Sequence, residues 1–345
     1  MRLIAGVLVA TLLLLACGCA GDEERDVRAP APTVPTYSFP DAPIVVRGPL
    51  GRRVEDALSR LLPDAAVGIL DPEALNVIAD SHDARLGWLV ADLLRFYQGG
   101  LEERQLVAAF RELTRIDVRR DPHFSDGAWR AVADHLIAWD LPAPPRYRER
   151  KAQLYLAIEP GWRPFFADAD SAIDWRLVGW GGVLIDDRSL GDRNGCVRGC
   201  IPALDDPALT DADGGDWYPD ERIVFGVVVG DEAVAFPKNI MEVHELVNVT
   251  IGSRRLGIPY CTLCSSAQAY LVDSVPRGVE PPVLRTSSLL SRSNKVMYGL
   301  RSRSVFDTFT GRALSGPLQA AGVVLPQTTV AAVARAGRGR RGDRT

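Results

Sequence analysis

The sequence predicts an α+β protein in which a helical N-terminal region is followed by a β-rich domain. Between residues 52 and 145, apolar residues recur three and four positions apart, which is the spacing of amphipathic helices. After residue 223, short β-branched runs alternate with glycine-containing turns, as in antiparallel strands. Pro142, Pro144 and Pro145 separate the two patterns, and 345 residues are enough for two domains.

The composition excludes some classes of protein without naming a function. Hydrophobic residues make up 47% of the chain and charged residues 24%, which is ordinary for a globular protein. The net charge of -4 argues against a nucleic-acid-binding role. The chain has no P-loop, no Gly-x-Ser-x-Gly and no His-Glu-x-x-His. The sequence therefore leaves open whether the protein is an enzyme.

Residues 1–19 have the pattern of a lipoprotein signal peptide. Arg2 supplies a positive charge, and residues 3–16 are apolar but too few to form a stable membrane anchor. Cys17 and Cys19 stand where bacterial lipoproteins carry their lipidated cysteine. We therefore expect export and anchoring to the extracytoplasmic face of the cell membrane through an acylated Cys17 or Cys19. An ordinary secretory signal with incidental cysteines is the alternative.

A proline-rich tether and a helical domain are expected next. Residues 20–51 are predicted to be extended and unpacked because prolines recur throughout them. The helical domain is assigned to residues 52–145. Within it, Asp71-Pro72 has the composition of a helix start, and an apolar stripe from residue 86 ends at Gly99-Gly100. Short joins between such helices predict a small antiparallel bundle.

The β-rich domain is assigned to residues 146–330 and opens with a junction. Residues 152–158 fit either a helix or a strand. Aromatic residues are concentrated between 162 and 180, and we interpret them as packing between the helical and β-rich parts, in preference to a ligand groove. Residues 331–345 are rich in glycine and arginine and are predicted to be a disordered tail.

Four cysteines remain outside the signal region. In an exported protein, thiols tend to pair or to bind metal. Cys196 and Cys200 lie in a loop rich in glycine and aspartate, and a local disulfide between them is the simplest interpretation. Four cysteines allow three pairings, so the sequence alone does not decide the fate of Cys261 and Cys264.

The stretch from residue 223 to 273 carries most of the chemistry. The runs 223–229 and 233–236 predict a hairpin around Gly230-Asp231, and a second hairpin is expected around Gly252-Ser253. Between them we predict a short helix with Asn239 as its N-cap and Glu242 completing a capping box, ending near residue 248. This helix would carry His244-Glu245, and the second hairpin leads into Cys261-Thr-Leu-Cys264.

The same stretch resembles a known family. The motifs are Gly226-Val-Val-Val-Gly-Asp-Glu-Ala-Val-Ala-Phe-Pro, His244-Glu-Leu-Val-Asn248 and Tyr260-Cys-Thr-Leu-Cys264-Ser-Ser-Ala267. Together with flanking matches from about residue 199 to 318, they resemble bacterial proteins of the domain of unknown function 3179. The resemblance implies membership of that family and little about the reaction. Family members tend to have Asn-Ser where this chain has Arg292-Ser293.

The residue types around the Cys-x-x-Cys suggest a soft-metal site. Cys261, Cys264 and His244 are ligands that suit copper or zinc. Glu245 and Asn248 would then orient the ligands without contacting the metal themselves. Two other interpretations stay open: a thiol-disulfide redox pair, since Cys-x-x-Cys is the spacing of such enzymes, or structural disulfides in a non-catalytic module that docks an envelope protein partner.

Overall fold

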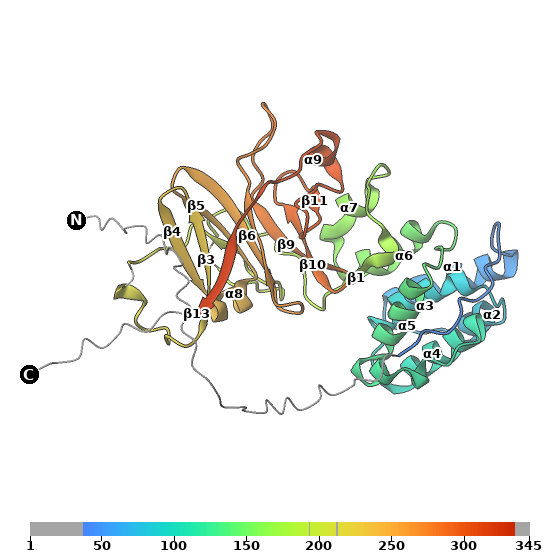
Figure 1. Cartoon of the computed structure of the whole chain (residues 1–345). Helices are drawn as coiled ribbons and strands as arrows, with labels where there is room; N and C mark the ends of the chain where they lie inside the picture. Colours follow the sequence, from blue (N-terminus) through green and yellow to red (C-terminus); the bar gives the residue numbers. More distant parts are fainter. Residues whose placement is uncertain (1–36, 193, 212, 335–345) are drawn as a thin grey trace, which may run out of the picture. The chain divides into compact units, whose positions relative to one another are not determined.

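The computed structural model of the chain describes residues 37–192, 194–211 and 213–334 (Figure 1). The predicted signal peptide with Cys17 and Cys19, the first part of the tether, and residues 335–345 of the predicted tail lie outside this part. Within this part, the residues from Phe39 onward belong to one compact unit. Among the described residues, no helix combines the length and the apolar character needed to cross a membrane.

The predicted α+β class is confirmed, and the helices extend further along the chain than expected. Asp71 caps α2 as predicted, because its side chain accepts hydrogen bonds from the backbone N–H groups of Glu73 and Ala74. Residues 152–158 are helical. The helices before the sheets are α1 (Arg52–Ala66), α2 (Pro72–Ala79), α3 (Gly87–Leu94), α4 (Gly100–Thr114), α5 (Ala128–Ala138), α6 (Tyr147–Ile158) and α7 (Arg163–Ala167).

The strands form three sheets that are mostly antiparallel. One sheet has the order β1-β9-β10-β11, the second β12-β8-β6-β5-β2 with β7 paired to β6, and the third β13-β3-β4. The strands are β1 (Val178–Trp180), β2 (Leu204–Asp205), β3 (Ile223–Val229), β4 (Glu232–Pro237), β5 (Leu246–Ile251), β6 (Arg254–Cys261), β7 (Ser266–Ala267), β8 (Ala269–Leu271), β9 (Leu284–Ser291), β10 (Asn294–Gly299), β11 (Val305–Phe306), β12 (Gln327–Thr328) and β13 (Val330–Ala334); the short helices α8 (Lys238–His244) and α9 (Gly316–Ala320) interrupt them.

The two predicted hairpins are confirmed. β3 pairs with β4 around Gly230, and β5 pairs with β6 around Gly252. Both glycines have positive φ values, +59° and +60°, which a tight two-residue hairpin turn requires and which glycine adopts without strain. The strands therefore form where the local pattern of β-branched runs and turns placed them.

The sheets stack in layers, and the helices lie against the outer face of the β1-β9-β10-β11 sheet (Figure 1). Side chains of β3 and β4 pack against β5 and β6, with Phe225 and Tyr260 in contact. A second core joins Leu246 of β5 and Tyr270 of β8 to Leu284 of β9 and Met297 of β10. On the other face of β9 and β10, Leu289 belongs to the same core as the helical residues. The predicted helical and β-rich parts therefore share a core.

Segments at both ends of the described chain are more ordered than expected. In the predicted tether, Leu50 is buried and the indole N–H of Trp139 donates to the carbonyl of Pro40 at 2.7 Å. Apolar side chains between the prolines thus pack on the helices, which the tether prediction missed. At the other end, residues 331–334 belong to β13, which pairs with β3, and not to a disordered tail. β13 consists of valines and alanines, and its backbone pairs with the hydrogen-bonding groups at the outer edge of β3.

The short helix α8 also differs from its prediction. It begins at Lys238 after Pro237 and has no side-chain cap, so the predicted capping box of Asn239 and Glu242 is wrong. The reason is local competition: Glu242 pairs with Lys238 one turn earlier, and Asn239 accepts from the adjacent N–H of Ile240. The helix ends at His244, four residues before the predicted end.

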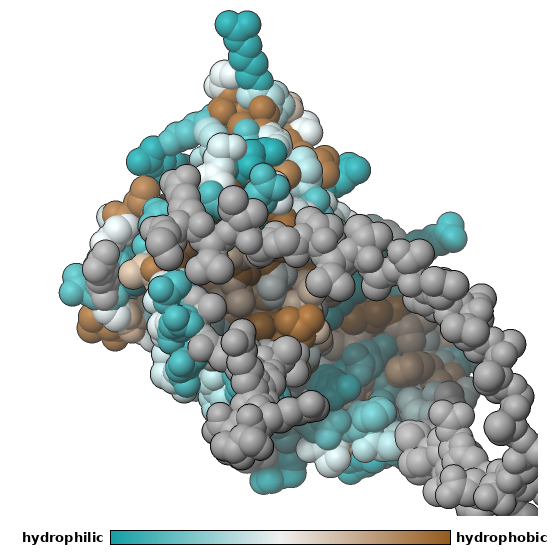
Figure 2. Space-filling model, turned by 60° about the vertical axis from the view of Figure 1, so that its left-hand side comes forward, coloured by the Kyte–Doolittle hydropathy of each residue, from teal (hydrophilic) through white to brown (hydrophobic). Residues whose placement is uncertain are grey.

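The surface in Figure 2 shows hydrophobic residues in separate groups between hydrophilic ones. Large hydrophobic side chains exposed near the helices include Val67, Ile69 and Leu101. Exposed apolar residues that are scattered are normal for a soluble protein surface. The idea that the helices dock an envelope partner therefore stays a prediction.

Candidate functional site

The Cys-x-x-Cys lies in a tight turn between two paired strands. Cys261 is the last residue of β6, and β7 folds back on it so that Cys261 is opposite Ser266. Ser265 has a positive φ of 49°, which lets the chain reverse within four residues. This geometry places the two thiols on one turn. Both cysteines are free in the structure.

The two thiols have different surroundings. Cys261 is 2% exposed, whereas Cys264 is exposed at the surface. The Cys264 sulfur lies 3.1 Å from Ser266 Oγ and 3.2 Å from Asn294 Oδ1, which comes from the start of β10. The Cys261 sulfur lies 3.8 Å from the carbonyl oxygen of Ser293. One thiol is therefore accessible to a partner molecule, and the other faces the interior.

The protonation of Cys261 reflects this burial. Desolvation, and then the neighbouring Cys264 thiol, raise the pKa of Cys261. The backbone N–H groups of Lys295 and Cys264 donate to its sulfur and oppose that rise, because they stabilise a thiolate. Cys261 is thus a thiol in the resting protein, with donors in place for the anion.

A buried lysine and a buried glutamate adjoin Cys261. The ammonium of Lys295, on β10, donates to the backbone carbonyl of Glu245 at 2.6 Å and lies 3.4 Å from Glu245 Oε2. Thr262 Oγ1 donates to the other carboxylate oxygen at 2.6 Å. Burial lowers the pKa of Lys295 to about 8, although the charges of Glu245 and Cys261 oppose this. A group with such a pKa can both accept and give up a proton near neutral pH.

A cavity of about 130 Å³ joins these groups. Its polar lining comes from the thiol turn, from Glu245 and Lys295 and from β9, and its remaining walls are apolar. The lining residues are Gly181, Val183, Ile201, Glu245, Cys261, Thr262, Leu263, Thr286, Ser288, Leu289, Leu290, Lys295 and Val296. Of the two cysteines, Cys261 lines this small cavity, together with the titratable pair of Lys295 and Glu245.

His244 does not join the two cysteines. Its Nδ1 lies 2.8 Å from the carbonyl oxygen of Pro202, and it lines a different cavity from Cys261. Glu245, the next residue, has a left-handed φ of 52°, so the neighbouring side chains leave the helix end in different directions. Across the described residues, Asp186, Cys196 and Cys200 are the group of three potential ligands found within 4.8 Å of one another. The structure thus does not gather Cys261, Cys264 and His244, and the metal site stays a prediction.

The two residues predicted to orient metal ligands have separate roles. Glu245 bonds Lys295 and Thr262, as described above. Asn248 is 1% exposed and bridges strands: its amide nitrogen donates to Leu284 O and to Asp205 Oδ1, both at 3.0 Å, and its oxygen accepts from Leu284 N–H at 3.0 Å. Asn248 therefore holds β5 against β9 and is not part of the lining around Cys261.

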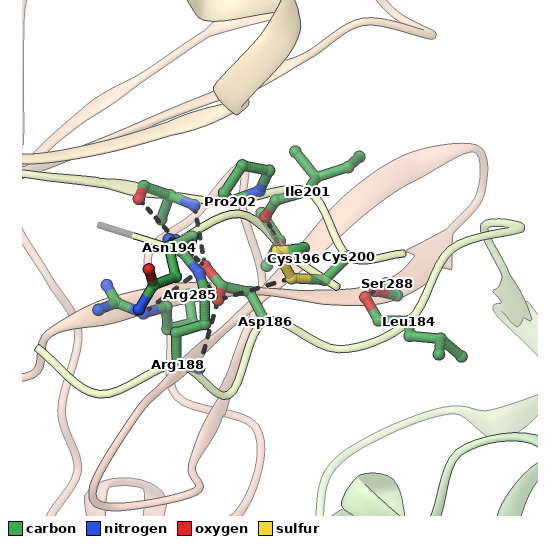
Figure 3. The surroundings of a disulfide bond; sticks show 12 residues. Leu184, Asp186, Arg188, Asn194, Cys196, Cys200, Ile201, Pro202, Arg285 and Ser288 are labelled. Atoms are coloured by element: carbon green, nitrogen blue, oxygen red, sulfur yellow. Dashed lines mark hydrogen bonds and ion pairs between the residues drawn. A yellow bond between two sulfur atoms is a disulfide. The ribbon is translucent and has the colours of Figure 1, made fainter. Parts of the chain in front are cut away.

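The predicted disulfide between Cys196 and Cys200 is confirmed (Figure 3). Beneath it, the fully buried Asp186 accepts from Arg188 Nε at 2.7 Å and from the N–H of Ala203 at 2.8 Å. The sulfur of Cys200 lies 3.8 Å from Asp186 Oδ1. Since the Asp186 carboxylate is already engaged, we interpret this group as structural: Asp186 holds Arg188 and the backbone at Ala203 together next to the disulfide.

Sequence reasoning missed Lys295 as a site residue. The signal was available in the composition, because only Lys151, Lys238 and Lys295 among the 40 basic residues are lysine. Arginine stays protonated in proteins, whereas a buried lysine shifts its pKa. In an arginine-rich chain, a lysine inside a strand is therefore a candidate for a group that must titrate.

The comparisons with known proteins agree with the resemblance noted in the sequence. Searches of curated proteins and of solved structures found no match to the chain. A family model described as "Protein of unknown function (DUF3179)" matches residues 198–336, which include β3 to β13, both thiols of the turn and Lys295. This part of the chain belongs to the DUF3179 family.

Proposed function

We propose that Cys261 and Cys264 form a dithiol–disulfide exchange centre. The observation that carries this proposal is the asymmetry of the turn: Cys264 is exposed, and Cys261 is buried beside a lysine whose pKa is about 8. Exchange needs an accessible thiol that attacks a substrate disulfide and a second thiol that resolves the mixed disulfide. The turn supplies both thiols, and Lys295 on the neighbouring β10 can take the second proton.

The reaction balances within this set of residues and a substrate disulfide R–S–S–R′. The Cys264 thiolate attacks one sulfur, forms a Cys264–S–S–R bond and releases R′–S⁻, which takes a proton from water. Cys261 then passes its proton to neutral Lys295 and attacks the sulfur of Cys264. The Cys261–S–S–Cys264 bond forms, and R–S⁻ leaves. The protein dithiol loses two electrons and the substrate gains them, and the reverse sequence oxidises a substrate dithiol.

The first test separates the two cysteines. Reduced Cys261→Ser protein should accumulate a mixed disulfide when mixed with oxidised glutathione, because Cys264 attacks and no thiol resolves the product. Cys264→Ser should stay largely unmodified, since its remaining thiol is buried. Acid quenching and intact-mass measurement distinguish the species. Equal glutathionylation of both variants would contradict the assigned order, and wild-type thiols that stay reduced would contradict exchange.

The metal centre of Cys261, Cys264 and His244, binding copper or zinc, remains the alternative proposal. It requires His244 to leave Pro202 and the turn to move toward it. Zinc titration of the reduced protein decides between the two. Zinc affinity that drops sharply in His244→Ala supports a shared metal, because a site that loses a ligand holds metal poorly. Equal zinc affinity in the wild type and His244→Ala would show that His244 is not a metal ligand and would favour the dithiol exchange centre.

We also propose that this centre works outside the cytoplasm on a lipid anchor. The signal-like pattern of residues 1–19 supports this, and so does the Cys196–Cys200 disulfide, since such bonds persist in oxidising compartments. The double variant Cys17→Ala/Cys19→Ala is expected to lose labelling by radioactive palmitate and to leave the membrane fraction. Each single variant identifies the acylated residue. A double variant that still labels would refute the anchor.

A further inference from the structure

A second cavity, of about 260 Å³, lies between the helices and the sheet that contains β9. Its walls come from α3, α5, the start of α6, β1 and the turn between β9 and β10. Four arginines line it, at positions 95, 130, 176 and 292, with Asp92 and Asp134. Its volume is just below the range of about 300–1,000 Å³ that is usual for ligand sites, which indicates a small ligand.

Most of these charges are already paired. Arg176 binds Asp174 at 2.6 Å and Asp140 at 2.9 Å, and Arg130 lies within 3.7 Å of Asp134. The Asp92 carboxylate, which is buried, receives the ammonium of Lys151 at 2.7 Å. These pairs build the walls of the cavity. They do not supply a free charge to a ligand.

Arg95 and Arg292 are different. The guanidinium of Arg95 stacks on the Trp129 ring, 3.9 Å from its centroid, and one of its terminal nitrogens donates to the carbonyl of Trp180. Its Nε is buried and has no hydrogen-bond partner in the described part of the chain. Arg292, at the β9–β10 turn, is exposed; among the described residues it forms no close ion pair, although it lies near enough to Asp174 for their charges to interact. A buried N–H that is left unsatisfied costs free energy, which a bound acceptor would recover.

We propose that this cavity binds a small organic anion, a carboxylate or a phosphate monoester, between Arg95 and Arg292. Guanidinium groups match the planar or tetrahedral oxygens of such anions and hold them by charge-assisted hydrogen bonds. The apolar lining, which includes Trp88, Ile137 and Leu290, would receive the body of the ligand. This cavity adjoins the thiol turn, because Leu290 lines both cavities and the carbonyl oxygen of Ser293 lies 3.8 Å from the Cys261 sulfur. The anion proposal does not require the exchange function proposed above.

Benzoate and phenyl phosphate, at matched ionic strength, are suitable probes, with benzamide as the uncharged control. Calorimetric titration should show binding of at least one anion and at least about tenfold weaker binding of benzamide. The stronger anion identifies the head group that the site prefers. If neither anion binds up to about 10 mM, or if benzamide binds equally well, the proposal is wrong.

Variants locate the anion. Arg292→Gln removes an exposed side chain and should leave folding intact, yet weaken binding by about tenfold or more. Arg301→Gln is the matched control and should leave the affinity unchanged. Arg301 is an exposed arginine in the turn between β10 and β11 of the same sheet, and it pairs with Glu280. Quenching of tryptophan fluorescence gives a second readout through Trp129. Equal affinity in Arg292→Gln and Arg301→Gln would overturn the site.

Discussion

Replacing Lys295 with methionine is expected to slow closure of the Cys261–Cys264 disulfide by about 10²-fold at pH 7, the usual contribution of a positioned proton acceptor. The physical reason is that Lys295 has a pKa of about 8, so about one tenth of it is neutral at pH 7 and can take the Cys261 proton, whereas an ordinary lysine has almost no neutral form at that pH. Without it, the thiol must lose its proton unaided, and burial holds the pKa of Cys261 above its ordinary value.

The pH profile is the decisive measurement. In the wild type, the rate of closure after mixing with oxidised glutathione should rise with pH and level off above about 8, as Lys295 becomes neutral. In Lys295→Met, the rise should move to higher pH and follow Cys261. Lys238→Met, which changes an exposed lysine paired with Glu242, is the matched control and should keep the wild-type profile. An unchanged profile in Lys295→Met would show that Lys295 only supports the fold.

A change at Glu245 tests independently whether Lys295 accepts the proton of Cys261. Its charge raises the pKa of Lys295 against the effect of burial. Glu245→Gln should therefore shift the wild-type midpoint to lower pH, because the neutral lysine forms more easily. A purely structural Lys295–Glu245 pair would instead change stability in both variants and leave the midpoint where it is.

The hairpins could be predicted because their signals are local. The β3–β4 and β5–β6 pairs each combine a β-branched run with a glycine in a positive-φ turn, and such patterns are complete within about fifteen residues of sequence. The Cys196–Cys200 disulfide closes a similarly short loop. None of these predictions depends on which strand packs against which.

The composition of the site could not be predicted in the same way. Lys295 meets Glu245 only because the tertiary fold brings β10 to the residue that follows α8, and 50 residues separate them in the chain. The position of His244 differs from the one expected beside the thiols for a more local reason. The helix ends there and Glu245 takes a left-handed conformation, so adjacent side chains diverge, His244 toward Pro202 and Glu245 toward Lys295. The conformation at the helix end thus decides that Glu245, and not His244, lines the cavity beside Cys261.

The largest stability effect is expected at Lys151, which ties the helices to the first sheet. Its ammonium is 1% exposed and donates to Asp92 at 2.7 Å, to the carbonyl of Trp175 at 2.9 Å and to the carbonyl of Val178. Lys151→Met leaves Asp92 as a buried carboxylate without its cation. Breaking a buried pair in this way typically costs about 3–5 kcal/mol. Urea unfolding at pH 7 should show a loss of this size, against less than about 1 kcal/mol for Lys238→Met.

Lowering the pH should reduce the stability that Lys151→Met loses relative to the wild type. Burial raises the pKa of Asp92, so its neutral form is favoured in the folded state once the positive charge is gone. A raised carboxyl pKa favours folding at low pH, and that advantage is lost as pH rises through the folded pKa. The gap between Lys151→Met and wild type should therefore be smaller at pH 5 than at pH 7. The double variant Asp92→Asn/Lys151→Met should recover part of the loss, because it removes the unpaired charge. If the double variant is less stable than Lys151→Met, the cost arises from the lost carbonyl contacts of Lys151 and not from the stranded carboxylate.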